Sequence, residues 1–481
     1  MLLSSLVGAD ATAPPGSGSI DIAGITADSR LVRPGYLFVA VAGTKADGAR
    51  FIADAIAKGA VAVLAGAETQ VVNQAVPVLR TSEPRRALAL MAARYYGAQP
   101  ETAVAVTGTS GKTSVADFTR QIFTALGHRA ASLGTIGLVK PDGAVYGSLT
   151  TPDPVTLHKT LAELASEGVT HIAFEASSHG LDQHRLDGVR LRAAAFTNLG
   201  RDHLDYHPTI EVYLAAKLRL FSELLPPGAT AVVNTDAAGA AEVVAAAHAA
   251  GRPVLSVGRT GEGLRLERLV REGFAQRMSV AHEGRTFDVR LPLLGDYQAA
   301  NALVAAGLAI AAGEAAGRVL PALQDLVGVK GRLEIVGGAR GGLAVVDYAH
   351  KPEALAAVLD ALRPFATGKL ICVMGCGGDR DKGKRPLMGA IAVDKSDVVI
   401  VTDDNPRSER PEAIRAEILG AAPGAREIGD RAEAIAAGVA MLGPGDVLVV
   451  AGKGHETGQI VGDKVLPFSD HDEVSKALGD G

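Results

Sequence analysis

The chain has 481 residues, of which 47% are hydrophobic and 21% charged, and its formal net charge is −5. This length predicts two to four domains, and the balance of apolar and charged residues excludes an intrinsically disordered chain. The negative charge argues against a nucleic-acid partner held by a basic surface.

Targeting and redox signals are weak in this sequence. No apolar stretch reaches the roughly 18 residues of a membrane span, so we expect no membrane insertion. Residues 1–7 lack the basic start and the long apolar run of a signal peptide. The two cysteines, Cys372 and Cys376, are too few for a closed zinc site, which needs four ligands. We therefore expect a reduced protein of the cytoplasm.

Apolar runs typical of buried strands alternate with alanine-rich helical patterns along almost the whole chain. The clearest runs are residues 61–65, 103–106, 171–174, 231–233, 343–346, 370–374, 398–401 and 447–451. Continuous apolar strands separated by helices predict parallel sheets covered on both faces, and therefore an α/β fold. A linker-like segment at 97–100 and a Gly-rich turn at 328–331 suggest three domains, with boundaries at residues 1–98, 99–331 and 332–481.

The first motif that carries chemistry follows the apolar run 103–106. After Thr107 it consists of Gly108, Thr109, Ser110, Gly111, Lys112, Thr113 and Ser114. Strand, Gly-rich turn and helix form the layout of a phosphate-binding loop, in which backbone N–H groups and the helix N-terminus face phosphate oxygens. Lys112 can reach the terminal phosphates, and the Thr113 hydroxyl can join a magnesium shell. The loop predicts a bound nucleotide triphosphate, although it is one residue shorter than the usual consensus.

Carboxylates and imidazoles follow in the same predicted domain. Glu175 ends the run 171–174, a position that suits either magnesium binding or a helix cap. The segment 198–207 holds two Asp, two His and an Arg, which favours metal or phosphate contact without showing which residue binds. Lys217 lies in an otherwise apolar helical stretch, where the residues alone favour a surface lysine whose stem covers apolar neighbours.

Charged loops end four predicted strands of the last domain, where α/β sheets bind their ligands. These loops are Asp347 to His350, the Gly-rich segment 375–386, residues 402–407 and residues 451–456. Asp, Asn and Arg together can bind both an ammonium and a carboxylate, as an amino-acid substrate requires. Each loop alone could be an ordinary turn, but several of them on one small domain favour a binding face.

These features together favour an enzyme that joins an amine to a carboxylate at the expense of ATP and magnesium. We find no Ser-His-Asp order and no zinc-ligand spacing that would indicate hydrolysis. A different class, an ATP-driven binding module without ligase activity, stays open. Such a module would release phosphate without depending on an amino acid.

The motifs together resemble the Mur ligase family over nearly the whole chain, and most closely its diaminopimelate-adding members. The matching segments are 28–30, 107–113, 150–152, 175–185, 201–207, Lys217, 331–334, 347–350, 375–386, 404–407 and 452–456. The resemblance implies three domains: a first that binds a UDP-sugar, a central P-loop-type parallel-sheet ATPase domain, and a Rossmann-like C-terminal domain that binds the amino acid. It also implies small-molecule substrates, UDP-MurNAc-L-Ala-D-Glu and meso-diaminopimelate, and a monomer in peptidoglycan synthesis.

The resemblance also implies a mechanism and residue roles. ATP phosphorylates the γ-carboxylate of the D-glutamyl residue, and the incoming amine attacks the acyl phosphate to give an amide. Lys112 binds the γ-phosphate, and Thr113, Glu175, His203 and Lys217, the last as an N-carbamate, organise Mg²⁺. Further ATP contacts are implied at Asn301, Arg332, Asp347 and His350. The UDP-sugar peptide is expected at Ser29, Thr150, Thr151, Ser177 and Arg185.

The expected amino-acid site contains the tetrad Asp404-Asn405-Pro406-Arg407, which is typical of diaminopimelate users. Arg407, with Arg380 nearby, can bind the distal carboxylate that lysine lacks, and Gly452 and Glu456 complete the implied set. A lysine-adding Mur ligase and a folylpolyglutamate synthase are the alternatives within the family. The tetrad and the segment 28–30 argue against both. The chain departs from the family pattern at Ser110, usually Asn, and at Thr44, usually His.

Overall fold

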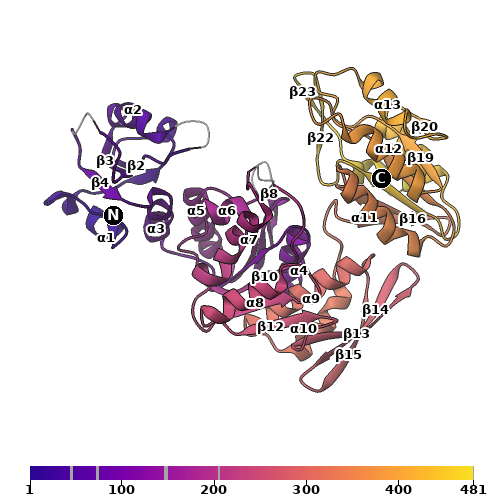
Figure 1. Cartoon of the computed structure of the whole chain (residues 1–481), viewed down its shortest axis with the longest axis horizontal. Coiled ribbons are helices and arrows are strands. Elements are labelled where there is room, and N and C mark those ends of the chain that lie inside the picture. Colours follow the sequence, from indigo (N-terminus) through magenta and orange to yellow (C-terminus); the bar gives the residue numbers. More distant parts are fainter. Residues whose placement is uncertain (44–46, 72–74, 146–149, 204–205, 480–481) are drawn as a thin grey trace. The chain divides into compact units, whose positions relative to one another are not determined.

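The computed structural model describes residues 1–43, 47–71, 75–145, 150–203 and 206–479 (Figure 1). Thr44, one of the two departures from the family pattern, lies outside the described residues. The chain divides into two compact units. The first comprises Met1–Leu264 and Val304–Val319, and the second comprises Arg265–Leu303 and Leu320–Gly481. The predicted boundaries of three domains are finer than this division and stay a prediction.

The N-terminal part of the first unit is a small parallel sheet with apolar cores on both faces. Its strands are β1 (Gly24–Thr26), β2 (Tyr36–Val39), β3 (Ala60–Gly66) and β4 (Val78–Thr81), in that order. Successive strand residues point to opposite faces, so Leu37 packs in one core and Phe38 in the other. The helices are α1 (Leu3–Val7), α2 (Ile52–Ala57) and α3 (Pro84–Tyr96).

The rest of the first unit is built on a larger parallel sheet. The strand order is β12 (Val254–Gly258), β11 (Thr230–Asn234), β10 (Leu191–Phe196), β5 (Thr102–Thr107), β9 (His171–Glu175) and β6 (Ala130–Gly134). The helices that connect these strands are α4 (Lys112–Ala125), α5 (Pro154–Ser166), α6 (Ser178–Asp182), α7 (Ile210–Arg219) and α8 (Ala240–Ala249). Every residue of β5, β6 and β9 is buried, which explains why β5 and β9 appear in the sequence as apolar runs.

The larger sheet continues into antiparallel strands that were not predicted from the sequence. β7 (Gly137–Lys140) and β8 (Gly143–Val145) extend from β6, and β13 (Leu264–Glu272), β14 (Ala275–His282) and β15 (Arg285–Leu291) form a meander. The meander strands are largely exposed on one side, so their sequences lack a continuous apolar run. Helices α9 (Asp296–Ala311) and α10 (Ala316–Ala322) follow.

The second unit contains a sheet with helices packed on both faces. Its order is β16 (Glu334–Ala339), β17 (Gly342–Asp347), β21 (Val447–Ala451), β18 (Leu370–Met374), β19 (Val398–Val401) and β20 (Arg426–Glu427). One core includes residues of α11 (Pro352–Leu362), α12 (Lys384–Lys395) and α13 (Pro411–Leu419). The other includes residues of α14 (Arg431–Ala440) and α15 (Asp470–Leu478), and a hairpin of β22 (Gly458–Val461) and β23 (Lys464–Pro467) lies between these two helices in sequence.

Strand register places the charged loops of this unit at one edge. Asp347 of β17 and Met374 of β18 both pair with Ala451 of β21, and Met374 also pairs with Val401 of β19. The four strands therefore end at the same level. The predicted α/β class with parallel sheets is confirmed. Among the helices of the described residues, none is long and apolar enough to cross a membrane.

Candidate active site

The predicted phosphate loop connects β5 to α4, and its backbone conformation depends on two glycines. Gly108 has φ +147°, and a Cβ there would lie 1.9 Å from Thr197 Oγ1, so only glycine fits. Gly111 has φ +87° and forms the N-cap of α4. Lys112 and Thr113 occupy the first turn of that helix. The backbone thus has the form in which N–H groups can face phosphate oxygens.

The loop backbone is fastened to the segment after β10. Asn198 Oδ1 accepts a hydrogen bond from Ser110 N at 3.0 Å, and Thr197 Oγ1 donates to Ser110 O at 2.7 Å. Gly200 N donates to Thr109 Oγ1 at 2.8 Å. The structure uses the backbone of Ser110 in these contacts, so the departure from Asn at this position leaves the support of the loop intact.

Two lysines converge on the carbonyl oxygen of Gly108. Lys112 Nζ donates to it at 3.0 Å, and Lys217 Nζ donates to it at 2.8 Å from α7. Lys217 is only 1% exposed and its Nζ lies 4.0 Å above the ring of Tyr213. The interpretation of Lys217 as a surface residue is therefore wrong, because α7 turns this face toward the loop. A helical spacing of four residues places Tyr213 and Lys217 on one face.

Burial changes the chemistry of the Lys217 amine. Desolvation, followed by the nearby charge of Lys112, lowers the pKa of Lys217 to about 6. The amine is therefore neutral at pH 7, and a neutral amine is the form that reacts with carbon dioxide. This environment suits the carbamate that the family resemblance implies.

Glu175 ends β9 beside the phosphate loop. It pairs in parallel register with Val106, two residues before Gly108. Its side chain is 2% exposed and accepts hydrogen bonds from Thr135 N at 2.7 Å and Thr135 Oγ1 at 3.3 Å. Among the described residues, these neutral donors are its only side-chain partners. A buried carboxylate without a cationic partner suits a divalent metal ion, which would compensate its charge.

His203 lies near the lysines through aromatic contacts. Its φ is +54°, its side chain is 43% exposed, and its ring centroid is 6.2 Å from that of Tyr213. The Tyr213 hydroxyl is 3.3 Å from Thr109 Oγ1. Tyr213 therefore contacts the loop, Lys217 and His203, although the sequence interpretation did not assign it a role. Its position four residues before Lys217 was the signal available.

Four residues expected to bind the UDP-sugar peptide lie close together. The Thr151 hydroxyl donates to Glu175 O at 2.9 Å and lies 2.9 Å from Ser177 Oγ. Arg185 donates to Thr151 O at 2.6 Å, and Thr150 Oγ1 lies 3.0 Å from the Thr135 hydroxyl that binds Glu175.

The fifth expected residue, Ser29, lies in the small N-terminal sheet region. Its carbonyl oxygen accepts from Lys58 Nζ at 3.1 Å. Among the described residues, no hydrogen bond links Ser29 to the other four.

The residues implied in further ATP contacts lie together in the second unit, whereas the phosphate loop belongs to the first. Asp347 is buried and accepts from Leu333 N at 2.7 Å and Ala349 N at 2.8 Å. Burial raises the pKa of the Asp347 carboxyl. The Arg332 guanidinium lies 4.7 Å above the Tyr348 ring, and the Arg332 carbonyl accepts from Gln298 Nε2 at 3.1 Å.

Two members of this implied set remain. Asn301 donates to the Gln298 side chain at 2.9 Å. His350 Nδ1 lies 2.8 Å from the Tyr348 carbonyl oxygen, and burial lowers the pKa of His350. These contacts join Asn301, Arg332 and His350 through Gln298 and Tyr348, and Asp347 directly precedes Tyr348 in the chain.

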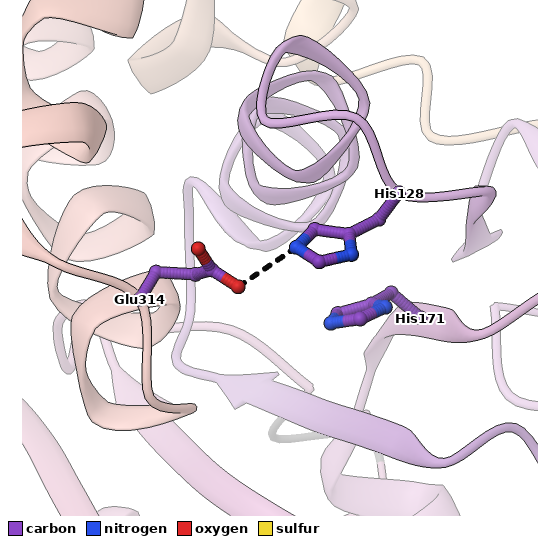
Figure 2. A group of neighbouring side chains, drawn as sticks. All are labelled: His128, His171 and Glu314. Atoms are coloured by element: carbon purple, nitrogen blue, oxygen red, sulfur yellow. Dashed lines mark hydrogen bonds and ion pairs between the residues drawn. The ribbon is translucent and has the colours of Figure 1, made fainter.

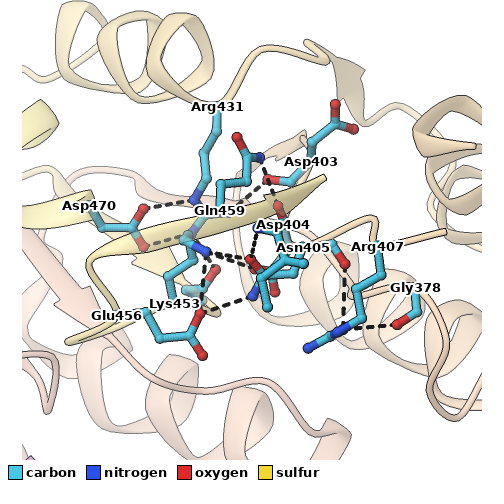
Figure 3. Close-up of polar contacts among 12 residues, drawn as sticks. Gly378, Asp403, Asp404, Asn405, Arg407, Arg431, Lys453, Glu456, Gln459 and Asp470 are labelled. Atoms are coloured by element: carbon cyan, nitrogen blue, oxygen red, sulfur yellow. Dashed lines mark hydrogen bonds and ion pairs between the residues drawn. The ribbon is translucent and has the colours of Figure 1, made fainter. Parts of the chain in front are cut away.

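A cavity of about 810 Å³ opens where β17, β18, β19 and β21 end. It is lined by every residue expected to bind diaminopimelate except Pro406, together with His350: Arg380, Asp404, Asn405, Arg407, Gly452 and Glu456. Arg407 has φ +53° and donates to Gly378 O at 2.8 Å (Figure 3). The cavity therefore offers the guanidinium groups of Arg380 and Arg407 for carboxylates, and carboxylates that include Asp404 and Glu456 for an ammonium.

Lys453 is the residue of this region that the sequence interpretation missed. It is fully buried, and its Nζ lies 3.0 Å from Asn405 Oδ1, 3.3 Å from Glu456 Oε2 and 3.5 Å from Asp404 Oδ1 (Figure 3). Asn405 Nδ2 donates to Glu456 Oε2 at 2.9 Å. The ammonium thus fixes the polar side chains that line the cavity. The signal was its place inside the motif Gly452 to Glu456.

Family models match three successive segments of the chain. The Mur ligase family catalytic domain matches residues 21–96, the Mur ligase middle domain matches 106–309, and the Mur ligase glutamate ligase domain matches 331–454. Together these segments cover most of the chain.

Two similar proteins and one solved structure carry the name UDP-N-acetylmuramoyl-L-alanyl-D-glutamate--2,6-diaminopimelate ligase. The protein of that name from Bradyrhizobium diazoefficiens is 59% identical over 99% of both chains. The one from Rhizobium meliloti is 62% identical over 96% of this chain and 95% of its own. A solved structure with the same name matches with a TM-score of 0.73 and 34% identity over 95% of both chains.

Proposed function

Because this chain belongs to the Mur ligase family, we propose that it joins meso-diaminopimelate to UDP-N-acetylmuramoyl-L-alanyl-D-glutamate at the expense of ATP. It is a ligase of peptidoglycan synthesis. The observation that carries this assignment is the full-length identity of 59% with a relative of that name. The cavity lined by Arg407 and Asp404 supports the choice of amino acid. We further propose that the chain acts as a monomer in the cytoplasm.

The first step forms an acyl phosphate. The γ-carboxylate of the D-glutamyl residue attacks the γ-phosphorus of ATP, and ADP leaves. Backbone N–H groups of the loop 108–113 hold the phosphates, and Lys112 neutralises charge that grows on the γ-phosphate oxygens. The fastening of the loop to Asn198 and Thr197 supports this role, since catalysis of phosphoryl transfer depends on positioning.

The second step forms the amide bond. The amine of diaminopimelate attacks the carbonyl carbon, a proton leaves the nitrogen, and inorganic phosphate is expelled. Arg407 and Arg380 bind the distal carboxylate, and Asp404 and Glu456 bind the distal ammonium. Asn405 and Gly452 complete this subsite. Lysine lacks the distal carboxylate, so its binding would leave the two arginines without the ligand group that they bind.

The residues around the phosphate loop suit magnesium. Glu175 supplies a buried carboxylate that has only neutral partners among the described residues, and Thr113 supplies a hydroxyl in the first turn of α4. His203 and carbamylated Lys217 would complete the set. Mg²⁺ bound there would neutralise charge on the phosphates. The carbamate forms when the neutral Lys217 amine adds to carbon dioxide and loses a proton.

The remaining implied residues bind the outer parts of the substrates. We assign Thr150, Thr151, Ser177 and Arg185 to the UDP-sugar peptide, since hydrogen bonds link them into one network that reaches Glu175. Ser29, in the small N-terminal sheet region, is assigned to the same substrate on the resemblance alone. Asn301, Arg332, Asp347 and His350 are assigned to ATP.

Phosphate release tests the ligase reaction. The purified chain is incubated with ATP, Mg²⁺ and UDP-MurNAc-L-Ala-D-Glu, with and without meso-diaminopimelate. We expect release only when all are present, and a product whose mass increases by one diaminopimelate residue. Phosphate release that does not need an amino acid would instead support an ATP-driven binding module.

A further inference from the structure

A cluster of two histidines and one glutamate lies at the end of the central sheet opposite the phosphate loop. His171 begins β9, the strand that ends at Glu175. A strand rises about 3.3 Å per residue, so His171 and Glu175, four residues apart, are separated by about 13 Å. His128 follows Gly127 after α4, and Glu314 follows Gly313 after α9. The cluster therefore joins three segments that are far apart in sequence, and all three belong to the first unit.

The three side chains are close enough to share one ion. His128 Nε2 and Glu314 Oε1 are 2.8 Å apart, and the rings of His128 and His171 are stacked with centroids 3.9 Å apart (Figure 2). One ligand atom from each residue lies within 4.8 Å of the other two. Ligands of a tetrahedral ion with bonds of about 2.1 Å lie roughly 3.4 Å apart. A modest rotation of His128 and Glu314, which are partly exposed, would bring the atoms together.

The hydrogen bonds of His171 orient it as a ligand. Thr170 Oγ1 donates to Arg129 O at 3.4 Å, and it lies 2.9 Å from His171 Nδ1. When this hydroxyl donates its proton to Arg129 O, it accepts from His171 Nδ1–H. The lone pair of His171 is then on Nε2, which has no hydrogen-bond partner among the described residues. Metal-bound histidines commonly donate their second N–H to an oxygen in this way.

We propose that His128, His171 and Glu314 bind a divalent transition metal ion such as Zn²⁺, Co²⁺ or Ni²⁺, with water completing the coordination. Two imidazoles and one carboxylate favour such ions over Mg²⁺, which prefers oxygen ligands. This site is separate from the magnesium site of the ligase reaction. By linking the start of β9, the end of α4 and the loop after α9, the ion stabilises the fold of the first unit.

Cobalt binding tests the site in the full chain. The protein is stripped of metal with a chelator, supplied with excess Mg²⁺ to occupy the oxygen-rich site, and titrated with Co²⁺ while its visible absorption is recorded. Variants Glu314→Gln and His171→Gln each remove one ligand. His248→Gln, which removes an exposed histidine of α8, is the matched control, and His203→Gln reports cobalt bound near the phosphate loop.

We expect the wild type and His248→Gln to bind one Co²⁺ that Glu314→Gln binds at least about 100-fold more weakly, since loss of an outer partner alone costs 10–100-fold. Zn²⁺ should raise the Tm of the wild type and leave that of Glu314→Gln unchanged. If His171→Gln does not fold, Glu314→Gln still tests the site, because Glu314 is partly exposed and its replacement should leave the fold intact. Equal cobalt affinity in the wild type and Glu314→Gln would overturn the proposal, as would a signal lost only in His203→Gln.

Discussion

The carbonyl oxygen of Gly108 accepts hydrogen bonds from two lysines, and one of them, Lys217, is buried beside the charge of the other. Burial and the charge of Lys112 make protonation of the second amine costly, so its pKa falls to about 6. In the unfolded chain the same amine has a pKa of about 10.4. The fold therefore holds a neutral amine at a cost in stability, which is typical of a group kept for its chemistry.

Replacing Lys217 by Met should separate stability from activity. In buffer stripped of carbon dioxide, the unfolded wild type binds one more proton than the folded wild type between pH 6 and about 10.4, so wild-type stability rises with pH across that window. The variant lacks this proton. The variant should therefore be more stable than the wild type, by an amount that is largest below pH 6 and shrinks toward pH 10. Comparing the Tm of the two proteins across this pH range measures the difference.

Whereas Lys217→Met should gain stability, it should lose ligase activity. We expect Lys217→Met to lower kcat by about 10²–10³-fold, and bicarbonate to restore the stripped wild type alone. Lys159→Met, which removes an exposed lysine of α5, is the control and should change neither quantity. A fully active Lys217→Met variant would show that the buried amine has no part in the reaction.

At the residue scale, the sequence predicts roles that depend on local backbone form better than it predicts whether a side chain is buried. The phosphate loop could be assigned from its own letters, because Gly108, Lys112 and Thr113 act through local backbone form. Lys217 and Lys453 could not, because a lysine among apolar residues fits a surface helix as well as a buried one. Their burial depends on contacts with Gly108 and Asn405, more than 40 residues away in each case.

Among the elements, the strands predicted correctly are those buried on both faces. β5, β9, β18 and β21 appear as apolar runs because no residue in them meets water. The meander β13 to β15 alternates charged and apolar residues and carries no such signal. The charged loops at the ends of β17, β18, β19 and β21 could be predicted to share an edge, since parallel strands place their carboxyl ends together.

Helices α14 and α15 are joined by an ion pair that supports the cavity. Arg431 and Asp470, both fully buried, are 2.7 Å apart, and Arg431 also donates to Ala451 O at 3.1 Å and Asp403 O at 3.3 Å (Figure 3). These carbonyls directly precede Gly452 and Asp404. The pair therefore positions two residues of the amino-acid site without lining the cavity itself.

Asp470→Asn should destabilise the second unit and weaken diaminopimelate binding. Removing one partner leaves a buried charge uncompensated, which costs about 3–5 kcal/mol. We expect a lower denaturation midpoint and a higher KM for diaminopimelate, with the KM for ATP less affected. The exposed pair of Asp360 and Lys395 provides the control, and Asp360→Asn should cost less than about 1 kcal/mol. Equal losses in the two variants would contradict a special role for the buried pair.

At the scale of the whole molecule, each compact unit carries its own part of the chemistry. The first holds the phosphate loop, Glu175, His203 and Lys217, and the second holds the cavity with Asp404 and Arg407. The order of motifs along the chain was enough to predict this family and its substrates. The sequence could not give the compact units themselves, because their extent depends on contacts between distant segments such as 304–319 and 1–264.

The central claim is that this ligase selects meso-diaminopimelate, and a competition experiment tests it most directly. The chain is given ATP, Mg²⁺, UDP-MurNAc-L-Ala-D-Glu and equal concentrations of meso-diaminopimelate and L-lysine, and the two products are counted by mass spectrometry. Arg407→Gln, which should lose about 2–5 kcal/mol of binding, is run beside the wild type, with Arg410→Gln as the exposed control. We predict a wild-type product ratio of at least about 100 to 1 for diaminopimelate, and a much smaller ratio for Arg407→Gln. Equal amounts of the two products from the wild type would contradict the assignment.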